Sequence, residues 1–163
     1  MDKKPVNSLI GASGVHFVCG ELSRRGFIVL PTIRNTPGID VLALSPNKRK
    51  TTLQVKTNWN AEEWLTPLET KIDADNDYFF VFVNLKGAVD QRPEYYVFPS
   101  LFVKNYAQKS FEAWKTMPTP TGRQHDPNNP IRKFPASERR VQKLGKWAQV
   151  NLQDFKDRWD SLL

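Results

Sequence analysis

The alternation of hydrophobic and polar positions divides the first third of the chain into one helix and three strands. Across residues 9–25 the apolar residues recur at spacings of three, four and seven, which is typical of a helix with one buried face. Gly26 follows directly and is suited to end that helix. The next apolar segments predict a short buried strand and two further strands, at 27–30, 39–44 and 51–57.

A central strand and a second helix are predicted in the middle of the chain. The nearly uninterrupted apolar run at 78–85 is typical of a strand that is buried on both faces. A further strand is expected at 94–98, followed by a helix over about 100–115. The acidic segment before them, 59–77, has no clear period, and we predict a loop with a short helix there.

The C-terminal third combines a proline-rich connection with an amphipathic helix. Five prolines between 118 and 135 predict a long structureless connection. Ser137 is a suitable N-cap for a helix that follows, either continuous or broken near 149–152. The order of elements predicts one mixed α/β domain over residues 1–163, with a C-terminal helical extension at about 137–163.

The composition excludes several classes of protein. With 39% hydrophobic residues, the chain can bury a core, so general disorder is excluded. The single cysteine, Cys19, excludes an intramolecular disulfide framework and a multi-cysteine zinc site. The longest strongly apolar run is too short to cross a bilayer, and no apolar stretch of signal-peptide type follows the N-terminus. We therefore expect a cytoplasmic protein without a membrane partner.

The charge favours a polyanionic partner. The chain has 24 basic and 17 acidic residues, a net charge of +7. Such an excess suits nucleic acid, because neutralised phosphates release counterions, although a basic surface that only confers solubility would have the same balance. The basic residues cluster in two places, around 48–50 and within 132–146. We predict that the nucleic-acid contacts come from these clusters: Lys48, Arg49, Lys50, Arg139, Arg140 and Lys143.

A candidate catalytic group lies on the two strands of one hairpin. A turn near 46–47 would place Asp40 opposite the end of the next strand, where Gln54 and Lys56 share a face. The Asp40 carboxylate, the Gln54 amide oxygen and the Val55 carbonyl are ligands that suit a hard divalent cation. The lysine could deprotonate a water molecule or stabilise charge on a phosphate. The same pattern also fits an ordinary polar strand face, with the aspartate in a turn.

This layout resembles the PD-(D/E)XK nuclease superfamily, which includes the archaeal Holliday-junction resolvases. The resemblance is carried by three segments, 11–27, 38–40 and 53–57. It implies a restriction-endonuclease-like fold with a central mixed β-sheet flanked by helices. It further implies that Asp40 and Gln54 bind Mg²⁺ or Mn²⁺ and that Lys56 is catalytic. Gln54 stands where most members have an acid, a replacement that also occurs within the superfamily.

The first helix departs from the family pattern. Val15 stands where related proteins tend to have a glutamate. Glu21 lies about 120° further around the helix and has Arg24 and Arg25 within four residues, so we predict a surface ion pair for it. His16 is closer in angle, although a lone helical histidine is more often structural. Asp40 would then be the single carboxylate of the site, which weakens its attraction for magnesium.

Three functions follow from these observations. The first is a Mg²⁺-dependent endodeoxyribonuclease that hydrolyses DNA, for which cutting both strands favours a homodimer. The second is a catalytically impaired nuclease fold that binds nucleic acid or a protein partner, and the third is an accessory protein that binds only proteins. Trp59 and Trp64 could stack on unpaired bases, but tryptophans packed beneath a loop would have the same sequence pattern.

Overall fold

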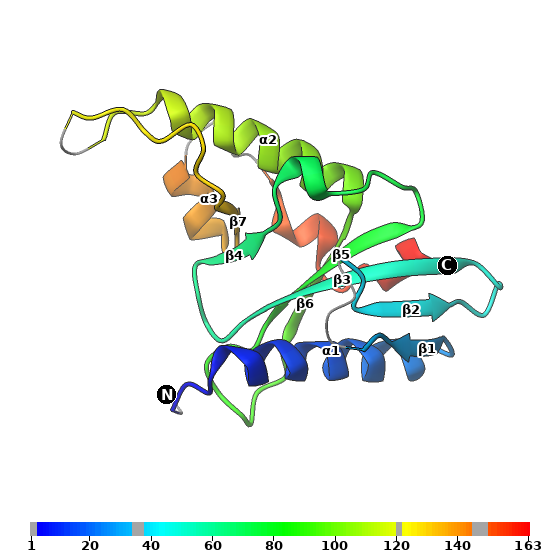
Figure 1. Ribbon diagram of the computed structural model, residues 1–163. Helices are drawn as coiled ribbons and strands as arrows, with labels where there is room; N and C mark the ends of the chain where they lie inside the picture. The colour runs from blue at the N-terminus through cyan, green and yellow to red at the C-terminus, as the bar shows by residue number, and fades with distance from the viewer. Residues whose placement is uncertain (1–2, 34–37, 120–121, 145–149) are drawn as a thin grey trace.

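A five-stranded mixed sheet and a separate two-stranded sheet organise the chain (Figure 1). The computed structural model describes residues 3–33, 38–119, 122–144 and 150–163. The elements in chain order are α1 (Asn7–Ser23), β1 (Ile28–Pro31), β2 (Val41–Leu44), β3 (Lys50–Asn58), β4 (Glu63–Thr66), η1 (Glu69–Lys71), β5 (Tyr78–Asn84), β6 (Glu94–Pro99), α2 (Ser100–Thr116), β7 (Arg132–Pro135), α3 (Glu138–Leu144), η3 (Leu152–Phe155) and η4 (Trp159–Leu162).

The large sheet has the order β1-β2-β3-β5-β6, and its middle pair, β3 and β5, is parallel. All other neighbouring strands in it are antiparallel. β5 is the central strand that its sequence predicts, because residues 78–83 are buried without exception. The predicted fold class, a mixed central sheet flanked by helices, is therefore confirmed.

The two faces of this sheet carry different cores. α1 covers one face, where small aliphatic residues such as Val18, Leu53 and Val81 pack together. α2 and the β4–β7 sheet cover the other face, which is aromatic (Figure 1). There the Phe82 ring packs against Trp64 and Phe134 at centroid distances of 5.0 and 4.8 Å.

One glycine sets how closely α1 approaches the sheet. A Cβ atom at Gly14 would collide with Oγ1 of Thr57 on β3, so only glycine fits without movement. This contact is adjacent in sequence to Lys56. The packing of α1 thus fixes the end of β3 where the predicted catalytic lysine lies.

The structure corrects three predictions of local structure. The strand predicted as buried at 27–30 is the edge strand β1, whose Ile28 and Leu30 side chains are 64% and 61% exposed. The 59–77 loop and the proline-rich stretch each contribute one strand, β4 and β7, and these pair with each other. Each is four residues long, so neither carries a periodic signal by itself.

The C-terminal segment begins as predicted and then differs. Ser137 is the N-cap of α3, and its Oγ accepts the Arg140 N–H at 3.1 Å. The predicted helix break near 149–152 lies partly outside the described residues. Beyond it the chain forms the short 3₁₀ helices η3 and η4, which bury Leu152 and Trp159 in the two cores. None of the helices within the described ranges is long and apolar enough to span a membrane.

Candidate functional site

Asp40 is held at the start of β2 by two hydrogen bonds to β3. Its backbone N–H donates to the Leu53 carbonyl at 2.8 Å, although Leu53 is also the register partner of Val41. Its carboxylate Oδ2 accepts the Val55 N–H at 2.7 Å. The Asp40 carboxylate therefore accepts a β3 backbone N–H that a further β2 residue would otherwise bind. This hydrogen bond fixes the position of the Asp40 side chain relative to β3.

Gln54 is buried on the aromatic face of the sheet and is tied to the segment that precedes β2. The Tyr78 hydroxyl lies 3.1 Å from Gln54 Oε1 and 2.6 Å from the Gly38 carbonyl, and its proton can be donated to one of them at a time. Gly38 has φ +77°, a conformation that favours glycine. Burial, assisted by the charge of Asp40, raises the pKa of Tyr78 to about 12, so the hydroxyl remains a donor at neutral pH.

Lys56 lies half-buried two residues beyond Gln54. Burial lowers the pKa of the Lys56 amine, and the negative charge of Asp40 offsets part of this effect. Among the ion pairs of the described residues, none within 4.0 Å joins the Lys56 amine to the Asp40 carboxylate. The amine thus senses the charge of the carboxylate from beyond ion-pair distance.

A hollow of about 490 Å³ opens beside Lys56. It is bounded by the end of β3, the loop after it, the start of β4 and the start of α1, with Asn7 and Glu63 among its lining residues. Lys56 lines this hollow, whereas Asp40 and Gln54 do not. The hydrogen bond from Val55 to Asp40, together with the effect of the Asp40 charge on the Lys56 pKa, places Asp40 beside the segment of β3 that bears Gln54 and Lys56, as the hairpin pattern predicts.

The available ligands fit a weakly held divalent cation. In a strand, the N–H and C=O of one residue point to the same side, so the Val55 carbonyl faces β2 as its N–H does. Together, the Asp40 carboxylate, the Gln54 amide oxygen and the Val55 carbonyl supply one charged and two neutral oxygen ligands. Mg²⁺ is commonly held by one or two carboxylates together with water and substrate phosphate, so this set fits an ion that needs the phosphate. Within the described part of the chain, no group of three His, Cys, Asp or Glu side chains forms a metal cluster.

The first helix adds no acid to this site. Val15 is half-buried and packs against the aliphatic core, and His16 is exposed. Glu21 pairs with Arg24 and Arg25, as its sequence position predicts. Glu21 itself is only 7% exposed, and Arg92 from the loop before β6 also reaches it at 3.5 Å. The predicted ion pair is thus present at the surface through the exposed Arg24, while the Glu21 carboxylate is buried.

The basic turn at 48–50 lies at the opposite end of the hairpin from Asp40. Lys48 and Lys50 are exposed. The Arg49 guanidinium binds Asp77 at 2.7 Å and donates to the carbonyls of Ser161 and Leu163 at 3.0 and 3.1 Å. Arg49 therefore ties the C-terminal residues to the sheet, a role that its sequence neighbours do not indicate.

The second basic group lies on α3, beside β4. Arg139 is exposed. Arg140 donates to Glu63 at 2.7 and 2.9 Å, and Lys143 lies 3.7 Å from Glu62. Contacts of this group and of the 48–50 turn with nucleic acid remain predictions.

The two tryptophans after β3 are packed in the protein. Trp64 is 1% exposed, and its Nε1 donates to the Val83 carbonyl at 2.9 Å, so it is not available for stacking on bases. Trp59 is half-buried against the aliphatic core. Of the two interpretations, packing beneath a loop is correct for Trp64.

The fold is similar to that of a known nuclease. No protein-family model matches the sequence, and neither does any curated protein. The structure resembles a solved one described as a bacterial homing endonuclease, I-Ssp6803I, with a TM-score of 0.58. The likeness covers 96% of this chain and 92% of that chain, at 12% sequence identity. Identity this low shows the fold alone, so the chain shares the fold of that endonuclease.

Proposed function

We propose that the protein is a metal-dependent nuclease of the PD-(D/E)XK type that hydrolyses phosphodiester bonds in DNA. The observation that carries this proposal is the seating of the Asp40 carboxylate on the Val55 N–H, beside the strand face that bears Gln54 and Lys56. The nuclease fold and the net charge of +7 support it. The similarity to a homing endonuclease favours DNA over RNA.

Each residue has a distinct part in the proposed reaction. Asp40, Gln54 and the Val55 carbonyl would hold Mg²⁺ or Mn²⁺. When bound, such an ion lowers the pKa of a water molecule and neutralises charge on the phosphate. Lys56 would accept a proton from the attacking water as a neutral amine or stabilise the charge on the phosphate as an ammonium, and its lowered pKa favours the first role.

The test is cleavage of supercoiled plasmid with Mg²⁺ or Mn²⁺. We expect cleavage by the natural chain and its loss in Asp40→Ala and in Lys56→Ala. Lys109→Ala is the matched control, because it removes an exposed lysine of α2 that lies outside both predicted basic clusters. Cleavage that persists in both site variants would reject these residues as the catalytic group.

A second candidate, a binding module that has lost catalysis, is favoured by the single carboxylate of the site. It predicts DNA binding that is sensitive to salt but independent of metal ions. Restoring the acids with Val15→Glu and Gln54→Glu separates the two candidates. Activity that appears in the double variant, where the natural chain has none, would support the binding module. No affinity for DNA at low salt would favour a protein that binds only protein partners.

For the proposed nuclease, cutting both strands also implies two active sites. We expect a homodimer, because a symmetric pair places one site on each strand. Light scattering at the concentration used for cleavage measures this directly, and a monomer that cuts both strands in one event would contradict it.

A further inference from the structure

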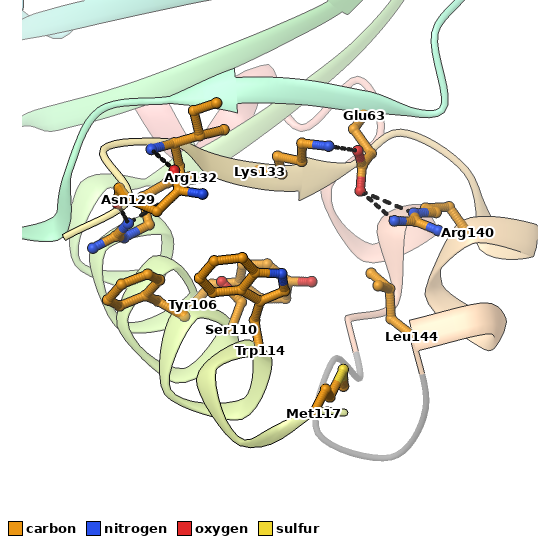
Figure 2. Close-up of a pocket in the computed structure, with 12 residues that line it drawn as sticks. Glu63, Tyr106, Ser110, Trp114, Met117, Asn129, Arg132, Lys133, Arg140 and Leu144 are labelled. Carbon is orange, nitrogen blue, oxygen red and sulfur yellow. Dashed lines mark hydrogen bonds and ion pairs between the residues drawn. The ribbon is translucent and has the colours of Figure 1, made fainter. Parts of the chain in front are cut away.

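A second hollow, of about 290 Å³, lies between α2, β7 and α3, and the proposed catalytic group does not use it (Figure 2). Tyr106, Ser110 and Trp114 face it from α2, while Lys133 and Arg140 come from β7 and α3. Its volume is near the lower end of small-molecule sites, roughly 300 to 1,000 Å³. It is therefore large enough for a small planar ring, but too small for a helix or strand of a partner.

The hydroxyl of Tyr106 is a buried polar group without a partner. The residue is 7% exposed, and its hydroxyl oxygen has no hydrogen bond to any residue that the structure describes. Burial, with a contribution from the charge of Glu63, raises the pKa of Tyr106, so the hydroxyl keeps its proton and can donate it. Nearly all buried hydroxyls in proteins are paired, and an unpaired one that lines a hollow indicates a missing acceptor.

The wall of the hollow is aromatic and is held in place. The Trp114 ring packs against Phe111 at a centroid distance of 5.6 Å and against His125 at 4.0 Å. The Arg132 guanidinium lies over Phe111, 3.4 Å from the ring centroid, and binds Glu69 at 2.7 Å. Because its neighbours fix the Trp114 ring, a ligand that packs against it would do so at little ordering cost.

The opening carries more positive than negative charge. Glu63 is bound by Arg140 at 2.7 Å and by Lys133 at 3.0 Å, so two cations meet one carboxylate. This excess suits a phosphate attached to a ring inside the hollow. Glu63 also lines the hollow beside Lys56, so the two hollows share a wall.

We infer that this hollow binds a single unpaired nucleobase of the nucleic acid. The base would pack against Trp114 and accept the Tyr106 hydroxyl proton at its edge, with its phosphate near Lys133 and Arg140. A nucleobase is the ligand that combines a planar aromatic face, an acceptor edge and an attached anion. The inference rests on the nucleic-acid binding of the proposed function, but it does not depend on cleavage.

Fluorescence anisotropy in EDTA tests this inference, with a labelled duplex compared to the same duplex containing one bulged nucleotide. We expect the natural chain to bind the bulged duplex roughly tenfold more tightly, as stacking of one base on an aromatic ring predicts. Tyr106→Phe and Trp114→Leu should each reduce this preference at least threefold while binding of the plain duplex is retained. Tyr95→Phe is the matched control, because Tyr95 is a buried tyrosine in the other core.

A second measurement uses the four nucleoside monophosphates as probes, with saturation transfer from the protein to the base protons. Transfer to at least one of them, lost in Trp114→Leu, supports the inference. No transfer together with equal affinity for both duplexes overturns it and assigns the hollow to another ring, such as an aromatic side chain of a protein partner. A chain that prefers the bulge but does not cut rejects the proposed cleavage alone, and a chain that cuts without preference rejects the inference alone.

Discussion

The carboxylate of Asp40 should have a measurable structural role in addition to its proposed catalytic one. Its Oδ2 accepts the Val55 N–H at 2.7 Å in a partly buried position. Asp40→Ala leaves that N–H without its partner, which costs about 1–3 kcal/mol for a fully buried donor. Water can reach this site in part, so we expect about 1–2 kcal/mol. For a domain of this length that corresponds to a fall in melting temperature of about 2–8 °C.

Asp40→Asn separates the hydrogen bond from the charge. The amide oxygen of asparagine can still accept the Val55 N–H, so most of the stability should be retained while cleavage is lost. Thermal and urea unfolding of the two variants measure the difference, with the exposed Asp90→Ala as a control. If Asp40→Ala were as stable as the natural chain, the carboxylate would not be seated on β3 as described.

Three further substitutions test the packing around the two hollows. Lys56→Met should raise the free energy of unfolding at pH 7, because burial lowers the pKa of Lys56 and the unfolded chain therefore binds the proton more tightly than the folded chain. Urea titrations should show this gain in stability vanish as the pH rises toward 10.5. Tyr106→Phe removes an unpaired buried hydroxyl, so chemical unfolding should find the unliganded protein as stable as the natural chain or about 1 kcal/mol more stable. A loss of stability of more than about 1 kcal/mol would show that the hydroxyl has a partner. Gly14→Ala should destabilise by about 1–3 kcal/mol through its collision with Thr57, whereas Gly20→Ala, in open space on the same helix, should be neutral or stabilising; equal melting temperatures for the two would refute the close contact.

The local geometry of the hairpin that bears the proposed catalytic group could be predicted from the sequence. The period of two in β3 places Leu53 and Val55 on one face and Gln54 and Lys56 on the other, and the packing of both aliphatic residues in the core beneath α1 agrees. The turn chemistry near 46–47 also sets the register in which Val41 pairs with Leu53, next to Asp40. These features depend on neighbours within a few residues, which is what a sequence pattern reports.

Features that join distant segments could not be predicted in this way. β4 and β7 become strands only because they pair with each other across the chain. Arg49 bonds to the carbonyl of Leu163, 114 residues away, so a residue predicted to contact nucleic acid also anchors the C-terminal segment. The Tyr106 hollow likewise needs three elements in contact, and no local period indicates it.

A crystal structure of the natural chain with Mn²⁺ and a DNA oligonucleotide tests the central claim most directly. The account predicts one anomalous peak about 2.1 Å from an Asp40 carboxylate oxygen and from Gln54 Oε1 or the Val55 carbonyl, with Lys56 beside the scissile phosphate. A peak held by other residues, or DNA bound with no manganese at Asp40, would contradict it.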